Sequence, residues 1–311
     1  MSESLTTNQL FIDTVSTLST VIQGKDLQIK KSLACLLASG HILFEDLPGT
    51  GKTSIAQALS KVLGLDYSRI QFTSDLLPAD VLGAMIFEQS SNQFHFQKGP
   101  VFTQLLLADE INRSSAKTQS ALLEAMAEEQ ITVDGDAYPL DKPFFVIATQ
   151  NPQSQFGTFP LPESQLDRFM LSVSIGYPDF ESEKSLLRGD TGRGNIAKLA
   201  SVLNAETILS LREEVKSVHC SDSLLDYVLR LVKATRSHVK LSYGISPRGA
   251  LALVEAAKAW AFIHQRDYVI PEDVQALLMN AWQHRLLYAA SSSIEAGAII
   301  EQILENTVVN V

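Results

Sequence analysis

A short glycine-containing segment, Asp46–Thr53, constrains the fold of this chain more than any other feature. Its sequence is Asp-Leu-Pro-Gly-Thr-Gly-Lys-Thr. An apolar run at 41–44 precedes it and has the character of a buried strand, while residues 53–59 follow it with helical spacing. Strand, glycine-rich turn and helix together form the context in which such a segment binds phosphate. The glycines let successive N–H groups point at one anion, and the helix start adds partial positive charge.

Two side chains of this predicted phosphate loop are candidates for contact with a nucleotide. Lys52 can reach the β- and γ-phosphates, and the hydroxyl of Thr53 can bind magnesium. One position departs from the general pattern, because Asp46 stands where the strict motif has glycine. That position lies farthest from the γ-phosphate and the rest of the motif is intact, so a phosphate loop is still predicted.

Length and composition exclude several classes of protein. The chain has 311 residues, which suggests about two domains, and 45% of them are hydrophobic. A formal net charge of −10, with no basic run longer than Lys30-Lys31, makes sequence-independent binding of nucleic acid a poor hypothesis. Cys35 and Cys220 lie far apart, so we expect reduced core thiols in a cytoplasmic protein. We see no secretory signal at residues 1–9, and no apolar run reaches the roughly 20 residues of a membrane span.

Strand and helix patterns alternate through the first part of the chain. Two helices are expected within residues 5–39, split at Gly24 and ended by Gly40. Helical patterns then separate five expected strands, at 41–45, 67–73, 104–109, 143–149 and 170–175. This alternation predicts an α/β fold in which a mainly parallel sheet lies between helices.

Two segments interrupt the alternation and are predicted to be hairpins. Residues 84–97 have a polar tip, and residues 130–139 turn at Asp134-Gly135. The glycine-rich stretch 189–195 is the best linker candidate, and every strong pattern after it is helical, with Pro271 opening one helix. We therefore expect an α/β core over residues 1–190 and a C-terminal all-α domain over residues 191–311.

Two adjacent acids end the predicted strand at 104–109. Asp109 can supply the second protein ligand that magnesium needs beside a phosphate loop, and Glu110 can orient and polarise the attacking water. Such a pair often does no more than solvate a strand end. Here it follows a Leu-Leu-Leu run about 60 residues after the phosphate loop, which favours the functional role.

Spacing alone does not decide the roles of three further polar residues. Asn151 could hydrogen-bond the γ-phosphate or the attacking water, or it could simply form a turn before Pro152. Arg168 lies beside an apolar face and could pair with Asp167. Arg248 begins a predicted helix and could be an ordinary surface arginine.

Five stretches of the chain, in order, resemble the MoxR family of AAA+ ATPases. The likeness extends from about residue 10 to the end and is strongest over 40–180; the stretches are 45–53, 71–80, 108–113, 148–152 and 161–169. The Glu-Asp opening of the phosphate loop is similar to this family. The hairpin at 84–97 resembles the family's helix-2 insert, and the hairpin at 130–139 resembles the one before its sensor strand.

The resemblance implies ATP/ADP and Mg²⁺ as cofactors and gives roles to the candidate residues. Lys52 and Thr53 match Walker A, Asp109 and Glu110 match Walker B, and Asn151 matches sensor 1. The metal ligands would be Thr53 and Asp109. The nucleotide would be bound by Asp46, Pro48, Gly49, Thr50, Gly51, Lys52, Thr53, Ser54 and Asp109.

The resemblance also implies roles for three arginines. Arg168 matches the arginine finger, which reaches the γ-phosphate of the neighbouring subunit. Arg248 matches sensor 2, presented by the C-terminal helical lid. Two roles remain open for Arg113: a contact across an interface, or an ion pair with a carboxylate.

The function implied by the resemblance is a cytoplasmic ring, expected to be a hexamer, that couples ATP hydrolysis to remodelling or maturation of client proteins. Those clients are expected to carry von Willebrand factor A domains. Alternatives are a magnesium-chelatase ATPase subunit, a DNA-dependent motor and a scaffold that barely hydrolyses ATP. The intact Glu110 argues against the scaffold, and the lack of an Asn-Lys-x-Asp motif argues against a GTPase. A DNA motor would want basic hairpin tips, but these are Ser90, Ser91, Asn92 and Asp134, Gly135, Asp136.

Overall fold

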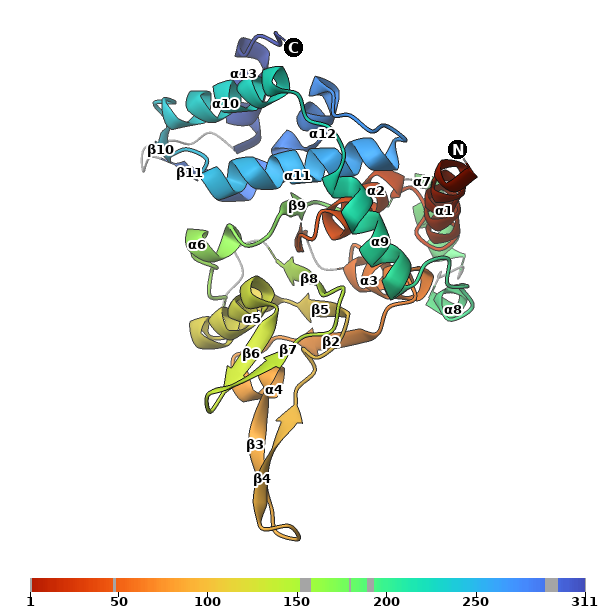
Figure 1. The fold of residues 1–311 in the computed structure, drawn as a ribbon, viewed down its shortest axis with the longest axis vertical. Helices are drawn as coiled ribbons and strands as arrows, with labels where there is room; N and C mark the ends of the chain where they lie inside the picture. Colours follow the sequence, from red (N-terminus) through yellow and green to blue (C-terminus); the bar gives the residue numbers. More distant parts are fainter. Residues whose placement is uncertain are drawn as a thin grey trace.

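The centre of the molecule is a five-stranded parallel sheet with strand order β2-β5-β8-β1-β9 (Figure 1). The computed structural model describes residues 2–46, 49–151, 158–178, 180–188, 193–288 and 296–310. The sheet is built from β1 (Ile42–Glu45), β2 (Tyr67–Gln71), β5 (Leu105–Asp109), β8 (Phe145–Gln150) and β9 (Leu171–Val173). All five strands lie where the sequence predicts them, so the α/β fold is confirmed.

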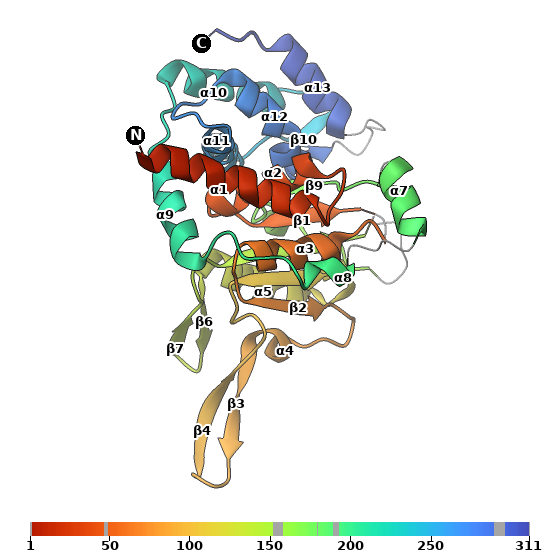
Figure 2. The ribbon, with the colours of Figure 1, turned by 90° about the vertical axis from the view of Figure 1, so that its right-hand side faces the viewer.

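Both faces of the sheet are covered, which explains why the central strands are continuously apolar. Leu105 and Leu107 of β5 face one hydrophobic cluster, whereas Leu106 and Ala108 face the other, because side chains alternate along a strand. The first face carries α1 (Ser2–Ser19), α2 (Asp26–Leu37) and α3 (Lys52–Val62), and the second carries α4 (Pro78–Leu82) and α5 (Ala116–Glu128) (Figure 2).

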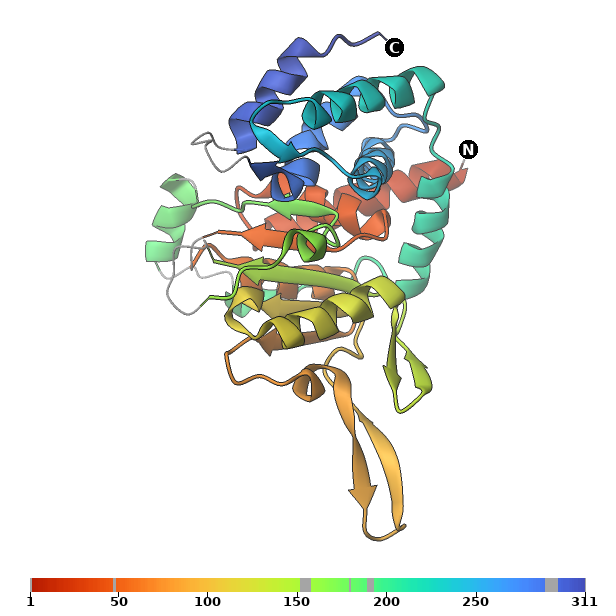
Figure 3. The same ribbon diagram turned by 90° about the vertical axis from the view of Figure 1, so that its left-hand side faces the viewer.

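Both predicted hairpins are present. β3 (Gly83–Glu88) pairs with β4 (Gln93–Lys98), and this hairpin extends away from the body of the molecule (Figure 3). The second hairpin joins β6 (Gln130–Val133) to β7 (Asp136–Pro139). Its turn residues Asp134 and Gly135 have φ of 51° and 93°, the left-handed pair that suits a tight hairpin. The rings of Phe96 and Tyr138 lie 4.3 Å apart, so the two hairpins contact each other.

The C-terminal part is mainly helical and packs onto the core. One hydrophobic cluster contains Leu33 and Leu36 of α2 together with Leu253 and Trp260 of α11. Residues 189–192 of the predicted linker lie outside the described residues, and the division at 190/191 remains a proposal. The helices after β9 are α7 (Phe180–Leu187), α8 (Arg193–Ile196), α9 (Ala205–Lys216), α10 (Asp222–Arg236), α11 (Pro247–Ile263), α12 (Pro271–Trp282) and α13 (Ala296–Asn306).

The expectation of an entirely helical C-terminal part is wrong at one place. β10 (Leu241–Tyr243) and β11 (Leu287–Tyr288) form a small antiparallel pair. Strands of two or three residues are too short to leave a periodic signal in the sequence. Pro271 opens α12 as predicted. Within the described part of the chain, no helix is long and apolar enough to cross a membrane.

His41, just before β1, is buried, and two backbone contacts select one tautomer of its neutral ring. Its Nδ1 accepts the N–H of Val146 at 3.0 Å, so Nε2 carries the proton and donates to the carbonyl of Met126 at 3.3 Å. Burial lowers the pKa of His41 to about 4, while the Met126 contact acts in the opposite direction. The unfolded chain takes up this proton near pH 6.5. The stability that neutral His41 contributes is therefore complete above about pH 6.5 and is lost as the pH falls towards 4.

Replacing His41 by Asn should lower stability at pH 7 but remove this pH dependence, because Asn keeps an oxygen acceptor for the Val146 N–H. Between pH 7 and pH 5, we expect the wild type to lose roughly 1–2 kcal/mol more unfolding free energy than the variant. Urea unfolding at the two pH values measures the difference. Equal losses in both proteins would show that His41 does not titrate in this way.

Candidate functional site

The phosphate loop enters α3 through two glycines with left-handed backbones. Gly49 and Gly51 have φ of 89° and 90°, and an added Cβ would meet no atom within 4 Å at either position. Glycine is therefore favoured here for its backbone conformation and not for lack of space. Thr50, Lys52, Thr53 and Ser54 complete the described part of the loop and the first turn of α3, whereas Pro48 lies outside the described residues.

Asp46, the residue that departs from the strict motif, ties the loop to the segment that follows β9. Its carboxylate accepts hydrogen bonds from Ser174 Oγ at 2.8 Å, from Gly176 N at 3.3 Å and from the N–H of Ile175. Glycine could not make these contacts. The structure therefore supplies a reason for the acid at this position that the motif alone does not contain.

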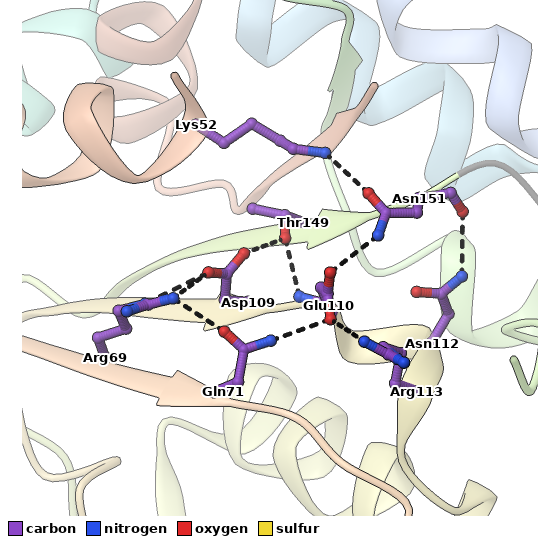
Figure 4. A network of polar contacts seen from close by, with 9 residues as sticks. All are labelled: Lys52, Arg69, Gln71, Asp109, Glu110, Asn112, Arg113, Thr149 and Asn151. Carbon is purple, nitrogen blue, oxygen red and sulfur yellow. Dashed lines mark hydrogen bonds and ion pairs between the residues drawn. The ribbon is translucent and has the colours of Figure 1, made fainter. Parts of the chain in front are cut away.

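Lys52 is buried at the start of α3 and reaches across to the end of β8 (Figure 4). Its Nζ donates to the carbonyl of Asp46 at 2.6 Å and to Asn151 Oδ1 at 3.3 Å. Burial lowers the pKa of Lys52, and the carboxylates of Asp46, Asp109 and Glu110 act in the opposite direction. The structure thus brings together Lys52 and Asn151, two predicted site residues 99 positions apart.

Asp109, the last residue of β5, is held by two residues that sequence reasoning missed (Figure 4). Thr149 Oγ1 donates to its Oδ1 at 2.6 Å, and Arg69 Nη2 donates to its Oδ2 at 2.7 Å. Thr149 lies on β8 and Arg69 on β2, the strands on either side of β5. Neighbouring parallel strands end at one edge of the sheet, so a polar residue near a strand end, such as Thr149, could have been recognised as a site residue from the sequence. Arg69 lies within its strand and carries no such signal.

Glu110 follows β5 with a left-handed backbone, φ 56°, and begins the turn η1 (Ile111–Arg113). Such a conformation is uncommon for a residue other than glycine and suggests a functional constraint. Its carboxylate accepts hydrogen bonds from Asn151 Nδ2 at 2.9 Å, Gln71 Nε2 at 3.1 Å and Arg113 Nη1 at 2.9 Å. The backbone N–H of Glu110 donates to Thr149 Oγ1 at 2.8 Å. Arg113 thus forms the carboxylate pair that was one of its two predicted roles.

Asn151 links the two halves of this network. It accepts from Lys52 through Oδ1 and donates to Glu110 through Nδ2, so a single amide connects the phosphate loop with the strand-end acids. The backbone carbonyl of Asn151 also accepts from Asn112 Nδ2 at 3.0 Å. These contacts support its predicted position beside the γ-phosphate.

Arg168 and Arg248 make their recorded contacts outside this network. Arg168 lies between α6 (Glu163–Leu166) and β9, and its Nη1 donates to the carbonyl of Leu123 in α5 at 2.6 Å. The alternative partner, Asp167, instead accepts from Arg285 at 2.8 Å. Arg248, in the first turn of α11, approaches Asp167 at 3.9 Å with a side chain that is 65% exposed. The role of Arg168 as an arginine finger and that of Arg248 as sensor 2 therefore remain predictions.

The fold and the site together define a class of protein. Backbone N–H groups and a lysine at a helix start can cradle phosphates, and two acids with an asparagine lie beside them. The arrangement rests on a parallel sheet with a helical region packed above it. This is the architecture of a P-loop nucleotide hydrolase of the AAA+ class.

Comparison with protein families agrees with this class. Residues 41–171 match the family described as "ATPase family associated with various cellular activities (AAA)", and residues 233–303 match the family described as "AAA lid domain". The chain is 38% identical to Chaperone MoxR1 of Mycobacterium tuberculosis over 92% of its own length and 78% of that protein. It is 48% identical to the uncharacterized protein YeaC of Bacillus subtilis over 88% and 86% of the two chains.

Solved structures show the same relationship. A candidate ATPase from Cytophaga hutchinsonii has a TM-score of 0.92 at 39% identity, covering 100% of this chain and 98% of that one. A full-length MCM homolog from Methanopyrus kandleri has a TM-score of 0.60 at 17% identity, covering 99% and 62%, which shows a shared fold. The chain belongs to the MoxR family of AAA+ ATPases. It binds nucleotide, and the reaction it catalyses is ATP hydrolysis.

Replacing Glu110 by Gln should leave ATP binding intact and slow turnover by about 100-fold or more, because the amide cannot accept a proton from water. Lys52→Ala should instead weaken ATP binding, since it removes a buried cation at the phosphate loop. Fluorescent-nucleotide titration and steady-state hydrolysis measure the two properties separately. Turnover near the wild-type rate in Glu110→Gln would remove Glu110 from the catalytic role.

Proposed function

We propose that this ATPase works as a ring, expected to be a hexamer, that remodels or matures a client protein. The observation that carries the proposal is the β3–β4 hairpin, which extends from the nucleotide-binding core into solvent (Figures 1 and 3). A projecting hairpin lies away from the strand-end acids and the phosphate loop and is well placed to contact a second molecule. A relative with 38% identity bears the name Chaperone MoxR1, which supports a client of this kind.

The chemistry of the hairpin favours a protein client over nucleic acid. Phe87 and Phe94 are 45% and 66% exposed, and their rings lie 5.1 Å apart across the two strands. Exposed aromatic side chains of this kind are typical of protein-binding surfaces. The exposed tip at 89–93 contains no Lys or Arg, the residues that a phosphate backbone requires.

We propose further that the client carries a von Willebrand factor A domain, as the family resemblance implies. Affinity purification of the Glu110→Gln variant with ATP from the native host tests both steps. A co-purified protein with such a domain is the expected result. Recovery of DNA alone would favour a DNA-dependent motor, and recovery of chelatase partner subunits would favour the magnesium-chelatase alternative.

For the chemical step, we propose that the ATP phosphates lie over the phosphate loop and that Thr53 and Asp109 hold Mg²⁺. Hydroxyl and carboxylate oxygens are the ligands that this ion prefers, so the residues present fit it. When bound, the ion neutralises charge on the β- and γ-phosphates. The nucleotide would contact Asp46, Pro48, Gly49, Thr50, Gly51, Lys52 and Ser54.

In the same proposal, the network around Glu110 orients the attacking water. Gln71 and Arg113 hold one carboxylate oxygen of Glu110 and Asn151 holds the other, so its orientation is fixed. Lys52 stabilises the negative charge that develops on the phosphoryl oxygens. Asn151, already bonded to Lys52 and Glu110, would contact the γ-phosphate.

The remaining side of the γ-phosphate would be completed by another subunit. Lys52 supplies a cation within the subunit, and a head-to-tail ring presents Arg168 of the next subunit to the open side. Arg248 would contribute a further cation from the helical lid. An arginine finger raises turnover by roughly 10³–10⁵-fold in other nucleotide hydrolases.

We also propose a cytoplasmic location. Cys35 and Cys220 are both free thiols, and Cys35 is fully buried. Free cysteines are typical of a reducing compartment.

The hairpin tip should matter for the client and not for basal hydrolysis. We expect replacement of residues 90–93 by a Gly-Ser turn to reduce client binding at least about 10-fold, the effect of losing roughly 1.4 kcal/mol of contact energy. Basal ATPase activity should stay within about twofold. Pull-down and ATPase assays measure the two effects, and a loss of basal activity would mean that the hairpin supports the core.

Arg168 should act on the neighbouring subunit. We expect Arg168→Ala to reduce turnover by about 10³-fold and specific activity of the wild type to rise with protein concentration. Mixing Arg168→Ala with Glu110→Gln should restore activity, because mixed rings contain interfaces with an intact Glu110 and an intact Arg168. If subunits exchange by light scattering yet the mixture is no more active than the sum of its parts, Arg168 is not a finger.

A further inference from the structure

The backbone around Arg168 is held by one buried side chain from the C-terminal helical part. Arg285 lies in the turn η2 (Gln283–Arg285) that follows α12. Its Nε donates to Asp167 Oδ1 at 2.8 Å, and its Nη2 donates to the carbonyl of Phe169 at 2.8 Å. Its Nη1 donates to the carbonyl of Met170 at 3.1 Å. One guanidinium therefore grips the residue before Arg168 and the two residues after it.

The environment of Arg285 shows that this contact is specific. Its side chain is only 3% exposed, and Nη2 also donates to the carbonyl of Asp167 at 3.1 Å, while Nη1 also donates to Ala281. Burial lowers the pKa of Arg285, and the carboxylate of Asp167 opposes that effect. Burying a cation is costly unless its donors are satisfied. The planar, five-donor guanidinium matches this set of acceptors, and a lysine could not.

Arg285 is part of a wider contact that covers the outer edge of β9. Asn280 Nδ2 donates to the carbonyl of Ser172 at 2.8 Å, and Gln283 Nε2 donates to the same carbonyl at 3.3 Å. Among the described strands β9 pairs with β1 alone, so its other edge needs such partners. Gln283 binds beyond the segment 167–170 and Arg285 binds within it. A comparison of variants at the two positions can therefore distinguish a loss of contacts along the edge of β9 from a loss of the contacts that hold the segment around Arg168.

The side chain of Arg168 makes its contact on a different element, α5. Its Nη1 donates to the carbonyl of Leu123 at 2.6 Å. That contact is a single hydrogen bond from a cationic guanidinium to a neutral carbonyl, which an anionic phosphate from another subunit can replace with a stronger ion pair. The backbone, in contrast, is fixed by several bonds to a buried cation. Arg168 can thus change its partner while its point of attachment stays in place.

We propose that Arg285 is a positioning residue for Arg168: it fixes the segment 167–170 so that Arg168 reaches the nucleotide of the neighbouring subunit. This inference rests on the proposed role of Arg168 as a finger in trans. It gives the C-terminal helical part a direct effect on hydrolysis in the adjacent subunit. A misplacement of about 1 Å can reduce a rate by about 100-fold, so contacts that fix the backbone of residues 167–170 can have a large effect on turnover.

The first test is a kinetic comparison of Arg285→Lys with Gln283→Ala. We expect Arg285→Lys to lower kcat by about 10- to 100-fold while ATP affinity changes less than about threefold, because the phosphate loop is untouched. Gln283→Ala removes a neighbouring edge contact and should stay within about twofold of wild type. Thermal unfolding and light scattering establish that both variants fold and assemble. A wild-type kcat in Arg285→Lys, or an equal loss in both variants, overturns the proposal.

The second test asks on which subunit Arg285 acts. Mixing Arg285→Lys with Glu110→Gln should restore activity, since an Arg285→Lys subunit keeps its own Glu110 and receives an intact finger from its neighbour. A structural defect confined to the subunit's own site would not be rescued. If Arg168→Ala is rescued and Arg285→Lys is not, the positioning role is wrong and the finger stands. If neither is rescued although subunits exchange, both proposals fail.

The third test asks whether Arg285 acts through Arg168 or through Arg248, since both arginines lie close to Asp167 in sequence or space. Arg285→Lys should cause no further loss of kcat in an Arg168→Ala background but should keep its full effect in an Arg248→Ala background. The reverse pattern overturns the proposal. If Arg285→Lys does not fold, Asp167→Asn replaces it in the first two tests with the same direction of effect, because it removes the carboxylate that Arg285 binds.

Discussion

The site depends on the parallel alignment of β1, β5 and β8. Ala108 lies opposite Ala148, and Glu45 lies opposite Gln150, so the three strands end within one residue of the same level. The phosphate loop, the acids and Asn151 leave the sheet from that level and meet within hydrogen-bonding distance. An antiparallel neighbour would bring a strand start to this edge and separate the groups. Continuous burial of β5 and β8 on both faces holds the alignment in place.

The fold was largely predictable because its strongest signals are local. The alternation of strand and helix patterns predicted all five sheet strands, most clearly the apolar runs of β1, β5 and β8, and Asp134-Gly135 predicted the turn of the second hairpin. The phosphate loop, Asp109 and Glu110 were recognised from residue type and spacing. The pair β10–β11 was missed because two or three residues carry no periodicity, and its strands lie far apart in the sequence.

The partners of the predicted residues could not be read from the chain in the same way. Arg69 has the pattern of an exposed residue on an edge strand, and only the pairing of β2 with β5 places it at Asp109. Asp167 has an arginine beside it in the sequence, yet it pairs with Arg285, 118 positions away. Side chains such as these acquire their roles from tertiary packing, which outweighs sequence neighbourhood.

The helix α5 has a mechanical consequence. Its 13 residues span about 20 Å, and it joins the turn after Glu110 to the β6–β7 hairpin without an intervening loop. Tyr138 of that hairpin lies against Phe96 of the other. A helix of this length behaves as a rigid rod, so a tilt at its catalytic end would become a displacement of both hairpins. The same helix carries Leu123, whose carbonyl accepts the hydrogen bond of Arg168, so a tilt of the helix would also move this contact.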